Sequence, residues 1–597
     1  MLKEYRQNEK EGTGYPSIDR PWIQFYSKEA LENDIPNMKI YDYIRDLLKN
    51  HLESNCFEYF GNRITCKKFL TLTEKTARAF KYLAVKRGDI VSIISPTTPE
   101  AIFCVYGLNR IGAIANLIDP RLSIENIREK TADSKIIVCI DLIRDKIEQA
   151  ASKKQLIIYY SISESFPWYL SLGYGVKRGF KKGEEKFVGK RLSWKDFLKK
   201  ATTINRVIDT AYQSNEVVVI VSTSGTTGKS KLAQLTNENI NAVAWQYEYS
   251  GISHRLGDTF LNVMPIFLSY GVVTGIHMPL ALGFKSVIIP QRELSKVGTY
   301  LLKYKPQAYQ DIPAALEALI GDEKRFQNVD LSFLNNLGVG GDHLSENLEG
   351  RINDFLKKHK KDILVQKGYG MTEISSAAIV NVSKACNSIG SVGVPLPKTI
   401  AKIVDPNTGK ELGYDEVGEL YLSSPAVFAG YFKDQKATEY EVEIDSEKRR
   451  WVHTGDLFSM NERGELFFHE RMKAMFVRPD GHNNHPNTMN ELILKHPAVL
   501  DACTVGVSSP YHTHGKYPKS VIVLKDEYKG KEKEIQKELE DMCIREFSQR
   551  DVPYYYEFKE AIPFTPNGKV DFRRLEDEGI EHASEAEVLR RERATAR

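Results

Sequence analysis

Hydroxyl-rich and basic side chains gather at Val218–Lys231, the stretch of the chain with the clearest chemical character. Its sequence is V-V-I-V-S-T-S-G-T-T-G-K-S-K. Four β-branched apolar residues predict a buried strand, and the Ser, Thr and Gly residues after them predict a loop. Glycines let backbone amides approach an anion, hydroxyls donate hydrogen bonds to it, and lysines neutralise its charge. The stretch therefore predicts a polyphosphate-binding loop, with a surface turn as the alternative.

Four short polar sequences further along the chain could complete a site around bound phosphate. They are Tyr369–Glu373 (Y-G-M-T-E), His453–Asp456 (H-T-G-D), Glu470–Lys473 (E-R-M-K) and Pro566–Lys569 (P-N-G-K). A carboxylate can hold Mg²⁺ together with phosphate oxygens, and a lysine carries a compact charge on a long stem. Any one of these sequences alone is more typical of a turn, and only the four together indicate a phosphate site.

A Walker A loop is one candidate identity for the phosphate loop. That pattern requires Gly, four residues and then Gly-Lys-Ser/Thr. Gly228-Lys229-Ser230 fits its end, but Thr223 stands where the first glycine belongs. The nearest apolar stretch, Leu261–Phe284, supplies no aspartate at the end of a strand. The sequence therefore disfavours a P-loop NTPase.

The order of these stretches resembles the adenylate-forming superfamily, which comprises acyl-CoA ligases, luciferases and the adenylation domains of peptide synthetases. Its phosphate loop is T-S-G-T-T-G-x-P-K-G, and Thr223–Lys231 is T-S-G-T-T-G-K-S-K. Ser230 replaces the usual proline and Leu232 the usual glycine. The resemblance covers nearly the whole chain and is closest to bacterial-type fatty-acyl-CoA synthetases. Further matching stretches are Met264–Gly271, Val339–Leu344, Gly390–Pro395, Gly418–Leu420 and Gly430-Tyr431.

The resemblance implies an enzyme that binds ATP and Mg²⁺ and uses CoA as a co-substrate. A carboxylate would attack the α-phosphorus of ATP and expel pyrophosphate, a step that depends on positioning and electrostatic stabilisation. The positions that carry over as nucleotide and cofactor contacts are Thr223, Ser224, Gly225, Thr226, Thr227, Gly228, Lys231, Gly341, Asp342, Tyr369, Gly370, Asp456, Arg471, Lys473 and Gly481.

Three residues are implied to be catalytic. Lys569 would bridge the substrate carboxylate and the α-phosphate, and Thr372 would also contact that phosphate. Glu373 would hold Mg²⁺, with Thr226 as a second metal contact.

Around the nucleoside, Tyr369 would stack on adenine, while Asp456 and Arg471 would hold the ribose. Lys473 matches the hinge about which the small domain of this family rotates between its two reactions, and Gly481 would then line the thiol tunnel. A surface lysine at a domain boundary is an equal alternative for Lys473.

The acid pocket is implied to lie at Pro265–Tyr270 and Val339–Asp342. Amino-acid-activating relatives place an aspartate early in the pocket segment, and Pro265–Tyr270 contains no acid. Because an unpaired ammonium is costly in an apolar pocket, the substrate is expected to be a fatty, aryl or steroid-like carboxylic acid. The expected pocket residues are Phe267, Leu268, Tyr270, Val339, Gly340 and Ile374.

Two alternatives to a CoA ligase stay open. A stand-alone adenylating enzyme could load a carrier protein, although no carrier segment follows Lys569. A catalytically silent relative could act as a binding protein, and the departures that favour it are Ser230, Leu232, Leu268 and Ser424.

Composition limits the remaining function classes. The 597 residues are 42% hydrophobic and 27% charged, with a net charge of +4 that gives no reason to expect a nucleic-acid partner. Seven scattered cysteines without a C-x-x-C pair predict reduced thiols, and the polar N-terminus is no signal peptide, so a cytoplasmic protein is expected. Leu261–Phe284 carries no charge over 24 residues, but its prolines, glycines and His277 favour a buried helix and strand over a membrane span.

Alternating apolar strands and helices predict an α/β fold with a mostly parallel sheet. Helices are expected at 38–52, 73–84, 98–110, 239–247 and 532–547, strands at 89–95, 135–140, 156–160, 502–507 and 520–524, and a strand-rich part at 402–468. The expected organisation is a large AMP-binding domain (1–469) with layered α/β subdomains and a β-rich subdomain. A small mobile α+β domain (470–580) carrying the lysine and a charged tail (581–597) would follow it.

Residues 162–214 interrupt this alternation and are expected to form an insertion. Phe166, Trp168, Tyr169 and Tyr174 precede a stretch, 177–200, with ten Lys or Arg against three Asp or Glu. Aromatic and then basic residues could rest on an anionic membrane surface, so peripheral membrane contact through 166–200 is an open alternative to a solvated insertion.

Overall fold

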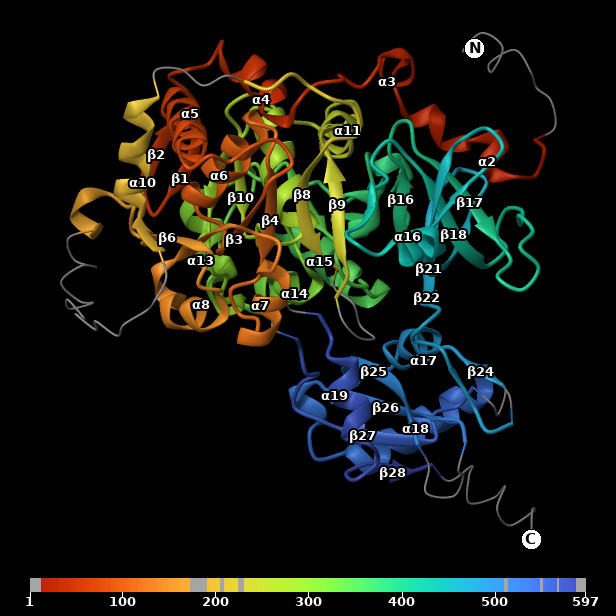
Figure 1. Cartoon of the computed structure of the whole chain (residues 1–597). Helices are drawn as coiled ribbons and strands as arrows, with labels where there is room; N and C mark the ends of the chain where they lie inside the picture. The colour runs from red at the N-terminus through yellow and green to blue at the C-terminus, as the bar shows by residue number, and fades with distance from the viewer. Residues whose placement is uncertain are drawn as a thin grey trace.

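The computed structural model describes residues 12–171, 190–204, 209–223, 230–480, 482–508, 514–547, 551–565 and 569–586. A large N-terminal domain holds two extended sheets, and a small C-terminal domain lies below it in Figure 1, reached through the end of β22. The expected α/β class, with a large domain that includes a β-rich part and a small C-terminal domain, is confirmed.

The first sheet has eight strands in the order β19-β9-β8-β4-β3-β5-β6-β7. The strands from β8 to β7 are parallel, whereas β9 returns antiparallel to β8 and β19 pairs antiparallel with β9. Their bounds are β3 Ile90–Ile94, β4 Ile114–Ile118, β5 Ile136–Ile140, β6 Leu156–Tyr160, β7 Lys190–Ser193, β8 Val217–Ser222, β9 Leu232–Thr236 and β19 Gly430–Tyr431.

The second sheet has fourteen strands and is parallel from β1 through β11, β10, β12 and β13 to β14. From β14 onward the pairing is antiparallel, which makes the part predicted to be strand-rich an extension of this sheet. The bounds are β1 Asn55–Tyr59, β2 Asn62–Thr65, β10 Thr259–Asn262, β11 Lys285–Ile288, β12 Ala308–Asp311, β13 Asn336–Val339, β14 Gln366–Tyr369, β15 Ile379–Val380, β16 Ser391–Pro395, β17 Ile400–Val404, β18 Gly418–Ser423, β20 Val442–Ile444, β21 Arg450–Met460 and β22 Leu466–Arg471.

Side-chain caps begin several helices of the large domain. Thr98 accepts a hydrogen bond from the Ala101 amide ahead of α6, as its place before Pro99 predicted. Thr236 and Asn239 form a capping box that starts α11. The longer helices are α4 Ile40–Leu48, α5 Cys66–Tyr82, α6 Pro99–Arg110, α7 Ile124–Thr131, α8 Arg144–Ala150, α10 Trp194–Lys200, α11 Asn237–Glu248, α13 Val297–Tyr304, α14 Pro313–Gly321, α15 Glu346–Lys358 and α16 Gln435–Glu441.

The uncharged stretch Leu261–Phe284 lies in the core, as expected. It contains the end of β10, a π-helix η4 at Tyr270–His277 and α12 at Met278–Ala281, and nearly all its side chains are buried. Within the described residues, no helix combines the length and the apolar character needed to cross a bilayer. π-Helices are rare in proteins, and those that occur frequently lie at functional sites.

Part of the interval expected to be an insertion belongs to the fold. Strand β7 pairs with β6 at the edge of the first sheet, and α10 buries Trp194 and Phe197. The basic composition of this interval predicted a solvated segment. In β7 and α10, however, Lys190, Lys195 and Lys199 are exposed while an apolar face points inward.

The small domain has its own sheet, ordered β25-β26-β27-β28, with separate apolar cores on it. Its elements are β25 Val499–Val507, β26 Tyr517–Leu524, β27 Tyr555–Phe558, β28 Ser584–Glu585, α17 Pro486–Ile493, α18 Glu532–Glu546 and α19 Phe572–Asp577, preceded by the pair β23 Phe476–Val477 and β24 Asn483–Asn484. All seven cysteines of the chain are free and buried, in agreement with the predicted reduced thiols.

Candidate functional site

The base of the predicted phosphate loop joins β8 to β9. The Thr223 amide donates to the Lys231 carbonyl at 2.9 Å, and the Lys231 amide donates to Thr223 Oγ1 at 3.2 Å. Lys231 Nζ lies 3.6 Å from Glu441 Oε2 and 4.4 Å from the centroid of the Tyr431 ring. The predicted contacts between these ends lie outside the described residues: Ser224, Gly225, Thr226, Thr227 and Gly228.

A strained turn after β14 carries the next predicted residues. Ser375 and Ser376 have φ values of 59° and 141°, which L-residues seldom adopt, and a methyl group at Gly370 would collide with the Ser376 carbonyl oxygen. This close turn leads into the short 3₁₀ helix η6 (Thr372–Ile374). It brings Thr372 Oγ1 to 3.4 Å from Ser269 Oγ, at the start of the π-helix.

Glu373, the predicted metal ligand, is buried beside the phosphate loop. Its Oε1 accepts a hydrogen bond from the Tyr431 hydroxyl at 2.6 Å. Burial raises the pKa of the Glu373 carboxyl, and this hydrogen bond opposes the rise. Tyr431 was absent from the predicted contacts, although its place in the Gly430-Tyr431 match was a signal that could have found it.

A second cluster forms where β21 and β22 pair. Asp456 is buried, its Oδ2 accepts from the Tyr369 hydroxyl at 2.8 Å, and its Oδ1 accepts from Arg471 Nε at 2.9 Å. Three predicted nucleoside contacts from distant parts of the sequence therefore meet. The hydrogen bonds hold the Asp456 carboxylate oriented, as ribose recognition would need.

Lys569 reaches this cluster from the small domain. The amide of the next residue, Val570, donates to Asp342 Oδ2 at 3.3 Å. Burial lowers the pKa of the Lys569 ammonium, whereas nearby Asp342 and Asp456 raise it and nearby Arg471 lowers it further. The ammonium therefore lies within electrostatic reach of the residues predicted to hold adenine and ribose.

The two domains also touch beside this site. Glu491 of α17 lies 2.8 Å from His343 Nε2, and the Asn487 amide donates to Glu470 Oε2 at 2.7 Å. Lys473, the predicted hinge, is exposed in the turn after β22. Gly481 lies outside the described residues.

The predicted pocket residues divide between two apolar cores. Phe267 and Ile374 belong to the main core, where Ile374 is fully buried, whereas Val339 belongs to the second core and Tyr270 packs against it. The other two predicted residues are the half-buried Leu268 and Gly340. The Tyr270 hydroxyl lies 3.4 Å from Gln310 Oε1, so this wall is not wholly apolar.

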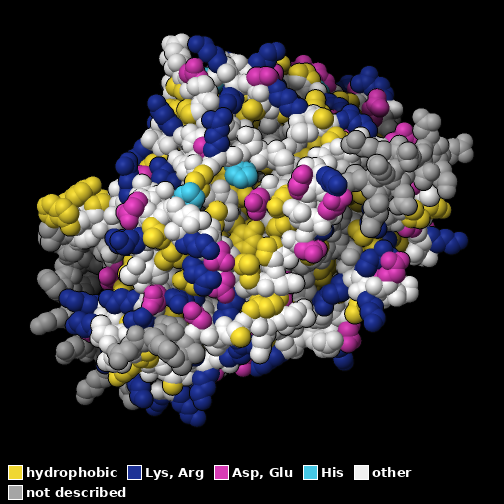
Figure 2. Space-filling view, turned by 90° about the horizontal axis from the view of Figure 1, so that it is seen from above, with side chains coloured by type: hydrophobic (Ala, Val, Ile, Leu, Met, Phe, Trp, Pro, Cys, Tyr) yellow, Lys and Arg dark blue, Asp and Glu magenta, His cyan; other side chains and the backbone are white. Residues whose placement is uncertain are grey.

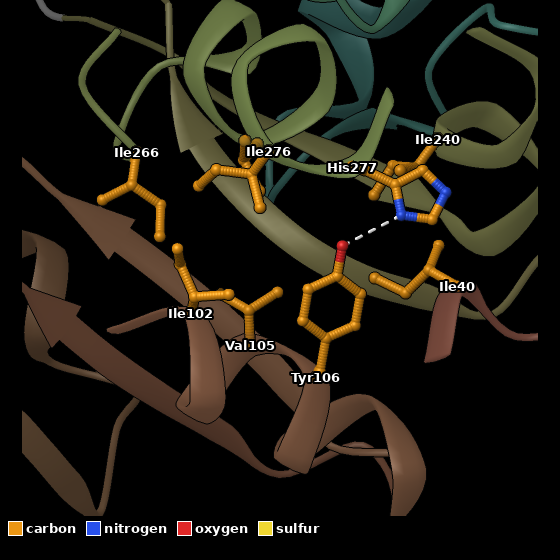
Figure 3. Close-up of a pocket in the computed structure, with 9 residues that line it drawn as sticks. Ile40, Ile102, Val105, Tyr106, Ile240, Ile266, Ile276 and His277 are labelled. Atoms are coloured by element: carbon orange, nitrogen blue, oxygen red, sulfur yellow. Dashed lines mark hydrogen bonds between the residues drawn. The ribbon is translucent and has the colours of Figure 1, made fainter. Parts of the chain in front are cut away.

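An apolar cavity of about 10 Å³ lies among η4, α4, α6 and α11, on the Val272 and Ile276 side of the π-helix (Figure 3). At its end the Tyr106 hydroxyl points at His277 Nδ1, 3.1 Å away, and Asn241 Oδ1 lies 3.0 Å from Nε2. Burial lowers the pKa of His277 to about 3, so the ring is neutral. A cavity of this size holds at most one water molecule, so it is not an acyl site in this conformation.

Comparisons with known proteins find similar sequences and structures over most of the chain. The long-chain-fatty-acid–CoA ligase of Bacillus subtilis (strain 168) is 25% identical over 574 residues, covering 94% of this chain and 99% of that protein. The probable 4-coumarate–CoA ligase 1 of Dictyostelium discoideum is 27% identical, covering 84% and 88%. The crystal structure of the anthranilate CoA ligase AuaEII with anthranoyl-AMP has a TM-score of 0.75 at 19% identity, covering 92% of this chain and 98% of that one.

Two family models match the chain in sequence order. The model of the AMP-binding enzyme C-terminal domain matches residues 488–569, the part that carries Lys569. The AMP-binding enzyme model matches residues 45–432, which include the phosphate loop, Thr372 and Glu373. The chain belongs to the AMP-binding enzyme family.

Proposed function

We propose that this chain is an ATP-dependent acid–CoA ligase that converts an apolar carboxylic acid to an acyl-adenylate and then to a thioester. The observation that carries the proposal is the position of Lys569, which the small domain delivers to Asp342, Asp456 and Arg471 of the large domain. The names of the relatives support it, because ligases that join acids to CoA occur among both the similar sequences and the similar structures.

In the first reaction, a carboxylate oxygen of the acid attacks the α-phosphorus of ATP and the bond to pyrophosphate breaks. Lys569 would hold both anions together, and Thr372 would donate to an α-phosphate oxygen. Lys231 and Thr223 would hold the leaving pyrophosphate. Asp456 would hold the ribose through its free hydrogen-bonding capacity, since Tyr369 and Arg471 already fix its orientation.

Glu373 fits a Mg²⁺ ligand. A buried carboxylate beside the end of a phosphate loop suits Mg²⁺, which binds through one or two carboxylates plus phosphate oxygens. The ion would supply charge neutralisation at the phosphates. Tyr431 orients the carboxylate, and Lys231 adds a positive charge on the same side.

In the second reaction, the thiolate of CoA attacks the acyl carbonyl and AMP leaves. We place the hinge for this change at Lys473, because it lies exposed in the turn between β22 and β23 that leads into the small domain. A change of backbone angle there would break the hydrogen bond from the Ala474 amide to the Arg471 carbonyl, which closes this turn. Rotation there would withdraw Lys569 and break the contacts of Val570 with Asp342 and of His343 with Glu491. The proposed domain boundary therefore falls at about residue 470.

The acid is proposed to be fatty or aromatic. The segment 265–270 has no carboxylate to pair with a substrate ammonium, and the residues behind the π-helix, including Ile266, Val272 and Ile276, are apolar. An acyl chain would enter the cavity that these side chains line only after they rearrange, because this cavity is too small as it stands.

The test is pyrophosphate release across a panel of acids, with and without CoA. We expect release with apolar acids and thioester formation when CoA is added. Release without a thioester would favour loading of a carrier protein. A folded protein that releases no pyrophosphate with any acid would favour the binding-protein alternative and contradict the proposal.

Membrane contact is a second proposal, and it concerns the partner rather than the reaction. Trp168, Tyr169 and Leu170 are 76%, 57% and 39% exposed, ahead of the basic stretch 177–200. Figure 2 shows hydrophobic side chains at the left margin, where Figure 1 places this segment. Adjacent exposed aromatic rings next to basic residues suit an anionic lipid surface.

Vesicle sedimentation tests the membrane proposal. We expect the protein to bind vesicles containing an anionic lipid, and we expect Trp168→Ser with Tyr169→Ser to abolish binding. Leu256→Ser, which changes a side chain that is 53% exposed elsewhere, is the matched control and should bind like the wild type. Equal binding by the double variant and the wild type would contradict the proposal.

A further inference from the structure

A lysine outside the family's matching sequences touches the end of the phosphate loop. Lys130 lies in the last turn of α7, and its Nζ donates to Ser230 Oγ at 2.8 Å across a separation of 100 residues. Helix α7 lies at the end of the first sheet where β8 ends and β9 begins (Figure 1). The contact therefore brings a positive charge to the point where the loop rejoins β9.

The hydroxyl that Lys130 contacts belongs to a residue that departs from the family's usual loop sequence. Ser230 stands where the resembling family usually has proline, which offers no hydrogen-bonding side chain. The next residue, Lys231, forms two hydrogen bonds with Thr223 through its backbone carbonyl and amide. These bonds fix the base of the loop, where Thr223 and Lys231 meet. Lys130 is thereby anchored beside Lys231 rather than left to sample the solvent.

The ammonium of Lys130 contacts a hydroxyl rather than a carboxylate. Within the described part of the chain, no carboxylate lies within ion-pair distance of Lys130 Nζ, and the side chain is half-buried. Lys433 differs: it contacts Asp133, just beyond the same helix, and its side chain is 63% exposed. Burial lowers the pKa of Lys130, with Glu129 opposing the shift, which indicates an ammonium that gains from a nearby anion.

We propose that Lys130 is a further phosphate-binding residue, held by Ser230 so that its ammonium neutralises the polyphosphate of ATP and the departing pyrophosphate. The inference rests on the proposed adenylation reaction, whose leaving group carries several negative charges. Lys130 and Lys231, together at the base of the loop, would compensate for the two departures from the usual loop sequence, Ser230 and Leu232. The alternative is that Lys130 only complements the carboxyl end of α7.

Direct binding of nucleotide by the full-length protein tests the proposal without requiring the correct acid. Isothermal titration with MgATP, pyrophosphate and AMP separates phosphate contacts from nucleoside contacts. For Lys130→Met we expect pyrophosphate and MgATP to bind about tenfold or more weakly, as for loss of a hydrogen bond to a charged group, while AMP binds as to the wild type. Lys130→Arg should restore most of the lost affinity, because the charge is kept.

Matched variants separate the roles of the two partners. Ser230→Ala should weaken pyrophosphate binding less than Lys130→Met, and the two changes together should cost less than the sum of their separate effects. Lys433→Met removes a neighbouring exposed lysine and should bind all three ligands normally. Wild-type affinity of Lys130→Met for pyrophosphate, or an equal loss for AMP, would overturn the proposal. Failure of the wild type to release pyrophosphate with any acid would instead contradict the proposed function.

Discussion

The hydrogen bond from Tyr431 to Glu373 gives a prediction with a defined magnitude. It is a 2.6 Å contact between a hydroxyl and a buried carboxylate. Tyr431→Phe removes the donor, keeps the ring beside Lys231, and leaves the carboxylate without a bond of the kind worth about 1.5–3 kcal/mol when one partner is charged. We therefore expect the Mg²⁺ concentration that gives half-maximal adenylation to rise about 10- to 100-fold.

The direction of the pH effect follows from the same contact. Burial already raises the pKa of Glu373, and the Tyr431 bond lowers it by stabilising the ionised form. Removing the bond raises the pKa further, so a larger fraction of Glu373 is protonated as the pH falls. The defect should therefore grow as the pH is lowered and shrink as the pH is raised, because a proton competes less with the metal at higher pH.

Initial rates of pyrophosphate release, titrated with Mg²⁺ at several pH values, measure this effect. Tyr440→Phe is the control, since Tyr440 is on the same helix as Glu441 and is 75% exposed. A Tyr431→Phe enzyme with an unchanged Mg²⁺ response, or with a loss that does not vary with pH, would refute the assignment of Glu373 as the metal ligand.

Two further predictions concern the hinge and the turn after β14. Lys473→Pro should harm thioester formation more than pyrophosphate release, because proline restricts the backbone where rotation is proposed. Single-turnover measurements of each half-reaction compare the two losses. Equal loss of both would contradict the hinge. Lys28→Pro, at the exposed first position of the helix Lys28–Glu32, where proline is tolerated, is the control and should spare both. Gly370→Ala should lower the midpoint temperature of thermal unfolding and the yield of folded protein, because the added methyl group collides with the Ser376 carbonyl oxygen. An unfolding midpoint equal to that of the wild type would contradict this geometry.

Local patterns predicted the elements well where a cap or a continuous apolar run marks them. Thr98 before Pro99, and the β-branched run ahead of Thr223, each identified an element that the structure contains. The strands β1 and β2 were missed, because the hairpin is short and its apolar residues are few. Strand β7 was missed because its sequence, K-R-L-S, is typical of a solvated segment. It forms a strand because it pairs with β6 at the edge of the sheet.

The nucleotide site could be predicted in its members but not in its internal contacts. The resemblance named Tyr369, Asp456 and Arg471, and the structure brings them together. It could not show that Tyr431 bonds to Glu373 or that Lys130 reaches Ser230, since those contacts depend on how β19 and α7 lie against the loop. The shape of the acid pocket could not be predicted from the sequence either. Ile374, for example, was expected to line the pocket but is fully buried in the main core.

The central claim is that Lys569 acts in adenylation and leaves the site before thioester formation. Its most direct test measures both half-reactions in Lys569→Ala: pyrophosphate release from ATP and acid, and thioester formation from a synthetic acyl-adenylate and CoA. We predict a loss of about 100-fold or more in the first and nearly wild-type rates in the second. An enzyme that keeps its pyrophosphate release, or that loses both half-reactions equally while folded, would contradict the account.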